Sequence, residues 1–153
     1  LVHMCGIIGL FLKDESLQSQ LGTLLTEMLV TMSDRGPDSA GIAIYGGDGE
    51  VSSSAAKITL QSSAPNEDFA DLAGDVAAAT GMDDNKVSLA VKDTHAVLTV
   101  PAGITADVRA SLGEIRPTVR IMSVGGAIEI YKEVGLPRSV AERFSVSQMS
   151  GTH

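Results

Sequence analysis

The chain has 153 residues, enough for one ordinary domain or two small ones. It is 44% hydrophobic and 20% charged, which predicts a globular protein rather than a disordered one. Its formal net charge of −8 argues against binding to nucleic acid or to an anionic membrane, because both need a basic surface. With three Phe, two Tyr and no Trp, the core is expected to be aliphatic.

The single cysteine, Cys5, cannot form an internal disulfide. No apolar run is long enough for a membrane span, and no signal peptide pattern occurs at the start, so we expect a soluble cytoplasmic protein. Residues 1–4 read as a cloning remnant followed by the initiator, Met4. Because the sequence contains no ligand cluster with metal spacing and no glycine-rich phosphate loop, we expect neither a metal nor a cofactor.

The first fifty residues predict a strand, a helix, a loop and a second strand. Residues 5–12 are a short apolar run that suits a buried strand. Residues 16–33 carry apolar side chains at spacings of three and four, so they predict a helix, with Ser16 as its N-cap. Residues 34–41 form a loop around Pro37. The next strand is predicted at residues 42–45, and a glycine-rich turn at residues 46–49 is expected to start a hairpin.

From residue 57 onward the pattern alternates as β-α-β-β-α-β, the order of the ferredoxin-like motif. The predicted elements are a strand at 58–60, a helix at 67–79, hairpin strands at 87–91 and 96–100, a helix at 105–115 and a strand at 118–122. Thr105 is the expected cap of its helix, and His95 is expected to be exposed in the hairpin turn.

The last part of the chain predicts one strand and one short helix. The strand covers residues 127–134, and the helix begins at Pro137 with Val140, Ala141 and Phe144 facing inward. Residues 145–153 are polar and predict no regular element, and the terminal His153 is assigned no role.

Cys5 is the first candidate for chemistry. If processing makes it the N-terminal residue, its own α-amine, with a pKa of roughly 7.7–8.0, can accept the thiol proton. One residue then supplies both nucleophile and general base. Taken alone, a cysteine beside an apolar run is more often a small buried hydrophobe.

A second motif supports the catalytic reading. Residues 35–43 read Arg-Gly-Pro-Asp-Ser-Ala-Gly-Ile-Ala, about 30 residues after the cysteine and across one amphipathic helix. Together with Cys5-Gly6-Ile7-Ile8-Gly9, this loop resembles the class II (N-terminal nucleophile) glutamine amidotransferases. The resemblance implies an α-β-β-α fold, to which residues 5–50 would contribute the first strands and helix. It also implies that Cys5 attacks the side-chain amide of glutamine, releasing ammonia for a partner synthase.

The resemblance also implies roles for the loop. Arg35 and Gly36 match residues that lie against the cysteine and shape its pocket. For Arg35, a purely structural loop role stays equally open, and Asp38 is either a turn residue or a supporting partner of the site. Gly41 is expected to allow close packing.

Other elements of the family's site are missing from this sequence. It contains no Gly-His-x-Arg segment, whose arginine binds the glutamine carboxylate in the family, and no Asn-Gly pair for the oxyanion hole. Losing one oxyanion donor typically costs about 10²–10³ in rate, so this chain alone is expected to be an inactive fragment.

The inserted segment suggests a subfamily and an alternative. Residues 57–135 lengthen the domain as in stand-alone amidotransferase subunits related to glutamate synthase, including the N-methylglutamate synthase type, which pass ammonia to a flavin-dependent synthase. Residues 136–153 would return toward the rest of the amidotransferase domain. The alternative is a non-catalytic regulatory or subunit-docking module with a vestigial cysteine segment. A homo-oligomer and a hetero-oligomer both stay open.

Overall fold

A computed structural model describes residues 6–35, 37–46 and 54–153. The chain divides into two compact units, one made of residues 1–50 and 130–153 and the other of residues 51–129. We call them unit 1 and unit 2 and describe each by itself. In the described residues, no helix has both the length and the apolarity needed to cross a membrane.

The predicted first helix of unit 1 is confirmed, as a 3-10 segment η1 (Glu15–Gln20) followed by α1 (Leu21–Thr31). The expected cap, Ser16, is wrong: Asp14 is the N-cap, and its carboxylate accepts hydrogen bonds from the backbone N–H and hydroxyl of Ser16 at 2.9 and 2.7 Å. These bonds favour the charged carboxylate and hold the pKa of Asp14 below its usual 3.8.

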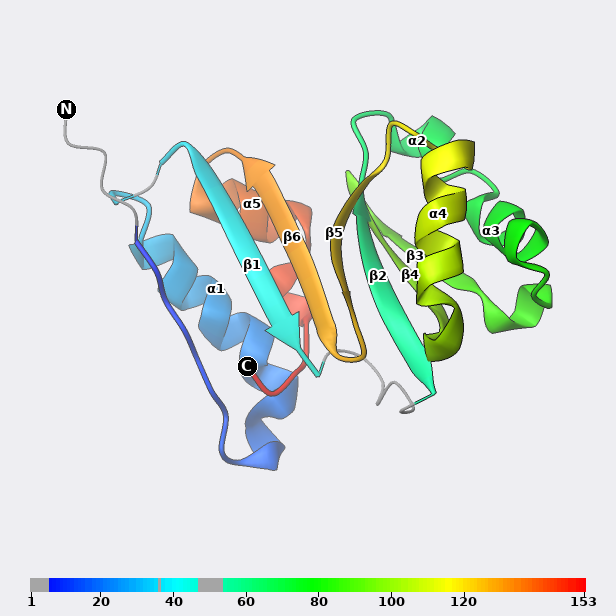
Figure 1. Cartoon of the computed structure of the whole chain (residues 1–153). Helices are drawn as coiled ribbons and strands as arrows, with labels where there is room; N and C mark the ends of the chain where they lie inside the picture. Colours follow the sequence, from blue (N-terminus) through cyan, green and yellow to red (C-terminus); the bar gives the residue numbers. More distant parts are fainter. Residues whose placement is uncertain (1–5, 36, 47–53) are drawn as a thin grey trace. The chain divides into compact units, whose positions relative to one another are not determined.

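The sheet of unit 1 has two antiparallel strands, β1 (Ser39–Tyr45) and β6 (Ile128–Val134) (Figure 1). Among the described residues, the partner of β1 comes from far along the sequence, and the hairpin expected after β1 falls on residues 47–53, which lie outside the described residues. The backbone N–H of Gly135 donates to the carbonyl of Asp38 at 2.9 Å, which closes one end of the pair. The remaining turn residues, 47–49, lie outside the described residues.

The C-terminal helix prediction is confirmed. Helix α5 (Pro137–Arg143) buries Val140 and Ala141, Phe144 follows it into the core, and a 3-10 turn η4 (Val146–Gln148) comes next. Phe144 packs against Tyr131 with ring centroids 5.3 Å apart. The expectation of an aliphatic core is thus wrong here, because an aromatic pair fills the space between β6 and α5.

The strand predicted at residues 5–12 is wrong for its described part, residues 6–12, which form no strand. Ile7 and Phe11 are 94% and 64% exposed. Leu12 is buried, and its backbone N–H donates to the carbonyl of Thr152 at 2.9 Å. A β-strand needs repeated backbone hydrogen bonds to a neighbouring strand. Residues 6–12 have one such bond, at Leu12, so they are not paired as a strand.

Unit 2 is a four-stranded antiparallel sheet in the order β3-β4-β2-β5. The sequence order β-α-β-β-α-β and this arrangement confirm the predicted ferredoxin-like motif. Figure 1 shows both main helices on one side of the sheet. The elements are β2 (Ala55–Gln61), α2 (Pro65–Asp68), α3 (Leu72–Thr80), η2 (Asp84–Lys86), β3 (Ser88–Lys92), β4 (His95–Pro101), η3 (Ala102–Ile104), α4 (Thr105–Ile115) and β5 (Arg120–Gly125).

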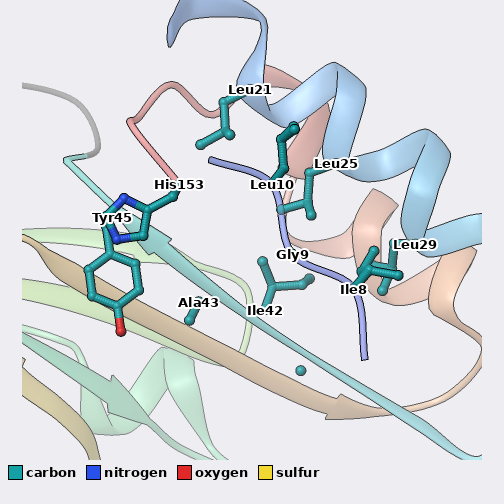
Figure 2. Close-up of a pocket in the computed structure, with 11 residues that line it drawn as sticks. Ile8, Gly9, Leu10, Leu21, Leu25, Leu29, Ile42, Ala43, Tyr45 and His153 are labelled. Atoms are coloured by element: carbon teal, nitrogen blue, oxygen red, sulfur yellow. The ribbon is translucent and has the colours of Figure 1, made fainter. Parts of the chain in front are cut away.

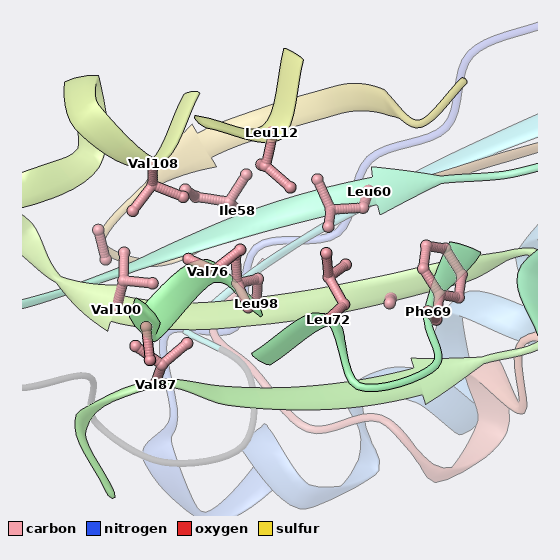
Figure 3. Packing of buried hydrophobic residues seen from close by; sticks show 13 residues of the cluster. Ile58, Leu60, Phe69, Leu72, Val76, Val87, Leu98, Val100, Val108 and Leu112 are labelled. Carbon is pink, nitrogen blue, oxygen red and sulfur yellow. The ribbon is translucent and has the colours of Figure 1, made fainter. Parts of the chain in front are cut away.

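The core of unit 2 lies between the helices and alternate positions of the central strands (Figure 3). Ile58 and Leu60 of β2 and Leu98 of β4 are fully buried beneath Val76 of α3 and Val108 of α4. Apolar side chains recur every two residues in the strands and every three to four residues in the helices, so they meet in one shared apolar layer. This layer gives unit 2 a core of its own.

Three local predictions in unit 2 are wrong. The helix expected at 67–79 is two helices, because Asp71 takes a left-handed conformation with φ +52° between α2 and α3. Thr105 does not cap α4 through its side chain. His95 is not exposed in a turn but is fully buried at the start of β4, since only Asp93 and Thr94 form the turn.

Candidate functional site

Cys5 and Gly36 lie outside the described residues, as do residues 1–4. The neighbours Gly6, Arg35 and Asp38 are described, so the site can be traced up to the residue after Cys5. All three belong to unit 1.

The backbone that follows Cys5 lies directly against the turn that carries Arg35. A β-carbon built on Gly6 would be 3.6 Å from Cβ of Arg35 and would overlap the terminal methyl of Met32. A side chain at position 6 would therefore push Met32 aside. The two motifs that the sequence separates by one helix are thus adjacent in space at Gly6 and Arg35.

Arg35 is held by its backbone while its side chain is exposed. Its N–H donates to the carbonyl of Met32 at 2.9 Å, in the turn that ends α1. Within the described residues, no hydrogen bond or ion pair occupies its guanidinium. An exposed guanidinium with five donors beside the cysteine segment can bind carbonyl or carboxylate oxygens.

Asp38 and Gly41 lie at the start of β1. Asp38 is exposed, and its carbonyl oxygen joins β1 to the end of β6 through Gly135. At Gly41 a β-carbon would be no closer than 3.7 Å to Lys132, an ordinary contact. The close packing expected at Gly41 is therefore not required by its described neighbours.

An apolar cavity of about 340 Å³ lies next to this segment within unit 1 (Figure 2). Three leucines of α1 form one wall of the cavity, residues 8–10 form a second, and β1 forms a third. The lining residues are Ile8, Gly9, Leu10, Leu21, Leu25, Leu29, Gly41, Ile42, Ala43, Tyr45 and His153. The described residues contain no group of three His, Cys, Asp or Glu side chains that could hold a metal ion.

His153 lines this cavity, although no role is predicted for it from the sequence. Its ring stacks on Tyr45 with centroids 4.4 Å apart and an interplanar angle of 13°, and it lies 5.4 Å from the ring of Phe11. No motif around His153 predicts this, because the contacts join segments far apart in the sequence.

Comparison with known proteins extends the resemblance beyond the two motifs. No protein-family model matches the chain. The chain is 57% identical over 150 residues to the "Glutamine amidotransferase-like protein GlxB" of Rhizobium meliloti (strain 1021), covering 98% of this chain and 48% of that protein. It is 29% identical over 160 residues to a "Putative glutamine amidotransferase" of Methanothermobacter thermautotrophicus, covering 98% of this chain and 50% of that protein.

The chain therefore spans about half the length of the curated relatives it matches. Because each match covers 98% of the chain, the similarity includes unit 2 as well as the segments around Cys5 and Arg35. The chain is similar to proteins named for glutamine amidotransferase over nearly all of its length.

Proposed function

We propose that the chain carries the nucleophile of a class II glutamine amidotransferase, and that Cys5 acts once it is the first residue of the protein. The α-amine of Cys5 takes the thiol proton, and the sulfur attacks the side-chain amide carbon of glutamine. The C–N bond then breaks, the nitrogen leaves as ammonia with that proton, and a γ-glutamyl thioester remains. Water hydrolyses the thioester to glutamate and restores the thiol.

The closeness of Gly6 to Arg35 carries this proposal. A β-carbon built on Gly6, the residue after the proposed nucleophile, would lie 3.6 Å from Cβ of Arg35, the arginine that the family resemblance puts beside it. The segment that follows Cys5 and the loop at residues 35–43, which were matched to the family by sequence alone, are therefore neighbours in unit 1. The similarity to two proteins named for glutamine amidotransferase supports the same activity.

We further propose that Arg35 orients the cysteine segment rather than reacting itself. Its backbone is held by the hydrogen bond to the carbonyl of Met32, and its guanidinium is an exposed donor group. Asp38 holds the junction between β1 and β6 through its carbonyl, so its role is to keep the loop that contains Arg35 in place.

The oxyanion donors and the glutamine carboxylate site are proposed to come from sequence that the longer relatives have in addition. This chain contains no Asn-Gly pair and no Gly-His-x-Arg segment, and it covers about half of each relative. Without donors aimed at the developing oxyanion, the chain alone is expected to hydrolyse glutamine very slowly. The ammonia is proposed to pass to a separate synthase.

Unit 2 favours a second role alongside this chemistry. Its core is formed by described residues of unit 2, and its four strands have the order of the ferredoxin-like motif. We propose that unit 2 is an inserted regulatory or subunit-docking module. If the chain has no catalytic role, this module function is the alternative.

One experiment separates the two functions. A protein that contains this chain and the additional half found in its relatives, processed to begin at Cys5, should release ammonia from glutamine. A diazoketone analogue of glutamine should label Cys5 in the same sample. The Cys5→Ala variant should lose both, and a form that retains Met4 should be labelled far more slowly because its Cys5 has no free α-amine.

Two outcomes would contradict one or the other function. If Cys5→Ala releases ammonia at the wild-type rate, the proposed nucleophile is wrong. If the processed protein neither releases ammonia nor takes up the label although it is folded, the non-catalytic role stands.

A further inference from the structure

β3 is an outer strand of the unit 2 sheet, and one of its edges has no strand beside it in the part of the chain that the structure describes. It pairs with β4 without interruption from Ser88 to Lys92. The other outer strand, β5, is interrupted by a register shift opposite Thr59 and Leu60. Bulges, charges and prolines keep an edge strand from pairing with another chain, and β3 carries only a lysine at its last position. Its outer edge can therefore accept a further strand.

The outer edge of β3 offers the backbone groups of two residues. A two-residue turn joins β3 to β4, so the residues on either side of the turn face each other as a hydrogen-bonded pair. Hydrogen-bonded and non-hydrogen-bonded pairs then alternate along the hairpin. The N–H and C=O groups of Lys92, Ala90 and Ser88 therefore point toward β4, and those of Val91 and Leu89 point outward.

The side chains of β3 have an apolar face and a small, polar face. Leu89 lies on the helix side of the sheet, where it packs against the core of unit 2 opposite Leu98 of β4. Val91 lies on the same face, because side chains alternate along a strand, yet it is 55% exposed. Ser88 and Ala90 point to the other face and are exposed. A partner strand with the same pattern would cover Val91 and extend the core.

We infer that the outer edge of β3 pairs with the same edge of a second copy of this chain, antiparallel and about a two-fold axis at Ala90. Leu89 then lies opposite Val91 of the second copy, and Val91 lies opposite its Leu89. Both pairs exchange backbone hydrogen bonds, because the groups of these residues point outward. The inference rests on the docking role proposed for unit 2, to which it gives a partner, and it needs no reaction at Cys5.

Charge and apolarity favour this register over its neighbours. In it, Lys92 faces Ser88 of the second copy, a small neutral side chain. An axis one residue nearer the start of β3 would put Lys92 opposite Lys86 of the second copy, and like charges that face each other are destabilising. An axis one residue nearer its end would put the apolar Leu89 opposite Asp93. The strand is therefore complementary to itself in one antiparallel register, which favours a second copy as its partner.

Sedimentation of the whole chain tests the association. One short strand from each copy buries less than the roughly 1,200–2,000 Å² of a stable complex, so the dimer should exchange with the monomer. The measured mass should therefore rise from monomer toward dimer as the protein concentration increases. Val91→Lys should abolish this rise, because it places a charge in each apolar pair. Ala110→Lys adds the same charge at an exposed position of α4 and should leave the rise unchanged.

A disulfide tests the register, in a chain whose other thiol is removed by Cys5→Ser. Ala90→Cys puts two thiols opposite each other at the axis, where the Cα atoms of a non-hydrogen-bonded pair are about 4.5 Å apart, within disulfide range. The control Ser88→Cys is exposed on the same face, but its two thiols would be about 13 Å apart along the strands. With oxidised glutathione as the oxidant, the linked dimer should form about tenfold faster in Ala90→Cys than in Ser88→Cys.

Two results would overturn the inference. In the first, the chain stays monomeric at every concentration and the two cysteine variants cross-link equally slowly. In the second, the chain associates, but Val91→Lys does not dissociate it and Ala90→Cys links no faster than Ser88→Cys, which would put the contact elsewhere on the molecule. Either result leaves the other proposals standing, because glutamine hydrolysis is measured through Cys5 and docking of unit 2 to a different protein needs no dimer.

Discussion

Lys57 and Glu129 form a buried ion pair in unit 2, with Nζ of Lys57 2.6 Å from Oε1 of Glu129 and side chains only 6% and 10% exposed. Lys57 lies in β2, and Glu129 lies in β6 just before the chain leaves unit 2. The pair therefore ties the last residues of unit 2 to the centre of its sheet.

Removing one member of this pair should lower the free energy of unfolding of unit 2. In Lys57→Met the carboxylate of Glu129 stays buried without its cation, and we expect unfolding of unit 2 to become easier by about 3–5 kcal/mol. The double variant Lys57→Met/Glu129→Met should recover a large part of that loss. Urea unfolding followed through NMR signals of unit 2 measures both, and a single variant as stable as the wild type would contradict the assigned role.

The elements of unit 2 could be predicted because its pattern is local and complete. In strands such as β2, buried apolar side chains such as Ile58 and Leu60 occur at every second residue, and in the helices they recur every three to four residues. Each strand of unit 2 pairs with another strand of the same unit. The position of His95 was missed because the turn is tighter than four residues. Asp93, with φ +54°, reverses the chain within two residues and brings His95 into β4.

Unit 1 was less predictable because its partners are distant in sequence. β1 pairs with β6 across all of unit 2, and residues 152–153 join β1 to Leu12. No local pattern specifies such pairings. The family resemblance predicts that the Arg35 loop lies against the cysteine segment, and a β-carbon on Gly6 would lie 3.6 Å from Cβ of Arg35. The roles assigned to Cys5, Arg35, Gly36 and Asp38 stay predictions.

Arg35 should affect the reaction of Cys5 without being the nucleophile. In the full-length processed protein, Arg35→Ala should slow labelling of Cys5 by the diazoketone analogue of glutamine about tenfold, equivalent to roughly 1.4 kcal/mol. Arg35→Lys should recover little, because lysine lacks the planar, multidentate guanidinium. Labelling by a small alkylating reagent that needs no glutamine pocket is the control and should change little; equal loss with both reagents would point to a merely structural arginine.

Asp14 should make the start of the first helix sensitive to acid. Its pKa is lowered in the folded protein by the hydrogen bonds from Ser16, so the stabilisation is present above the unfolded pKa of about 3.8 and is lost as the pH falls through the lower folded value. An NMR titration of the Asp14 carboxyl carbon should give a midpoint below 3.8. Asp14→Asn should keep a capping oxygen but remove this pH dependence at η1, whereas Asp14→Ala should lose the cap at every pH. A midpoint at or above the ordinary value would refute the capping role.

Two helical glycines should respond to alanine in opposite directions. A β-carbon on Gly22 of α1 would overlap the carbonyl oxygen of Val146 and lie 2.6 Å from that of Met149, and both are backbone atoms that cannot turn aside. Gly22→Ala should therefore push η4 away from α1 and destabilise unit 1 by about 1–3 kcal/mol. A β-carbon on Gly74 of α3 would meet nothing within 4 Å, so Gly74→Ala should stabilise unit 2 by about 0.5–1 kcal/mol through helix propensity. Thermal unfolding followed through NMR signals of each unit tests the pair, and an unchanged unit 1 in Gly22→Ala would show that η4 does not pack on α1 as closely as described.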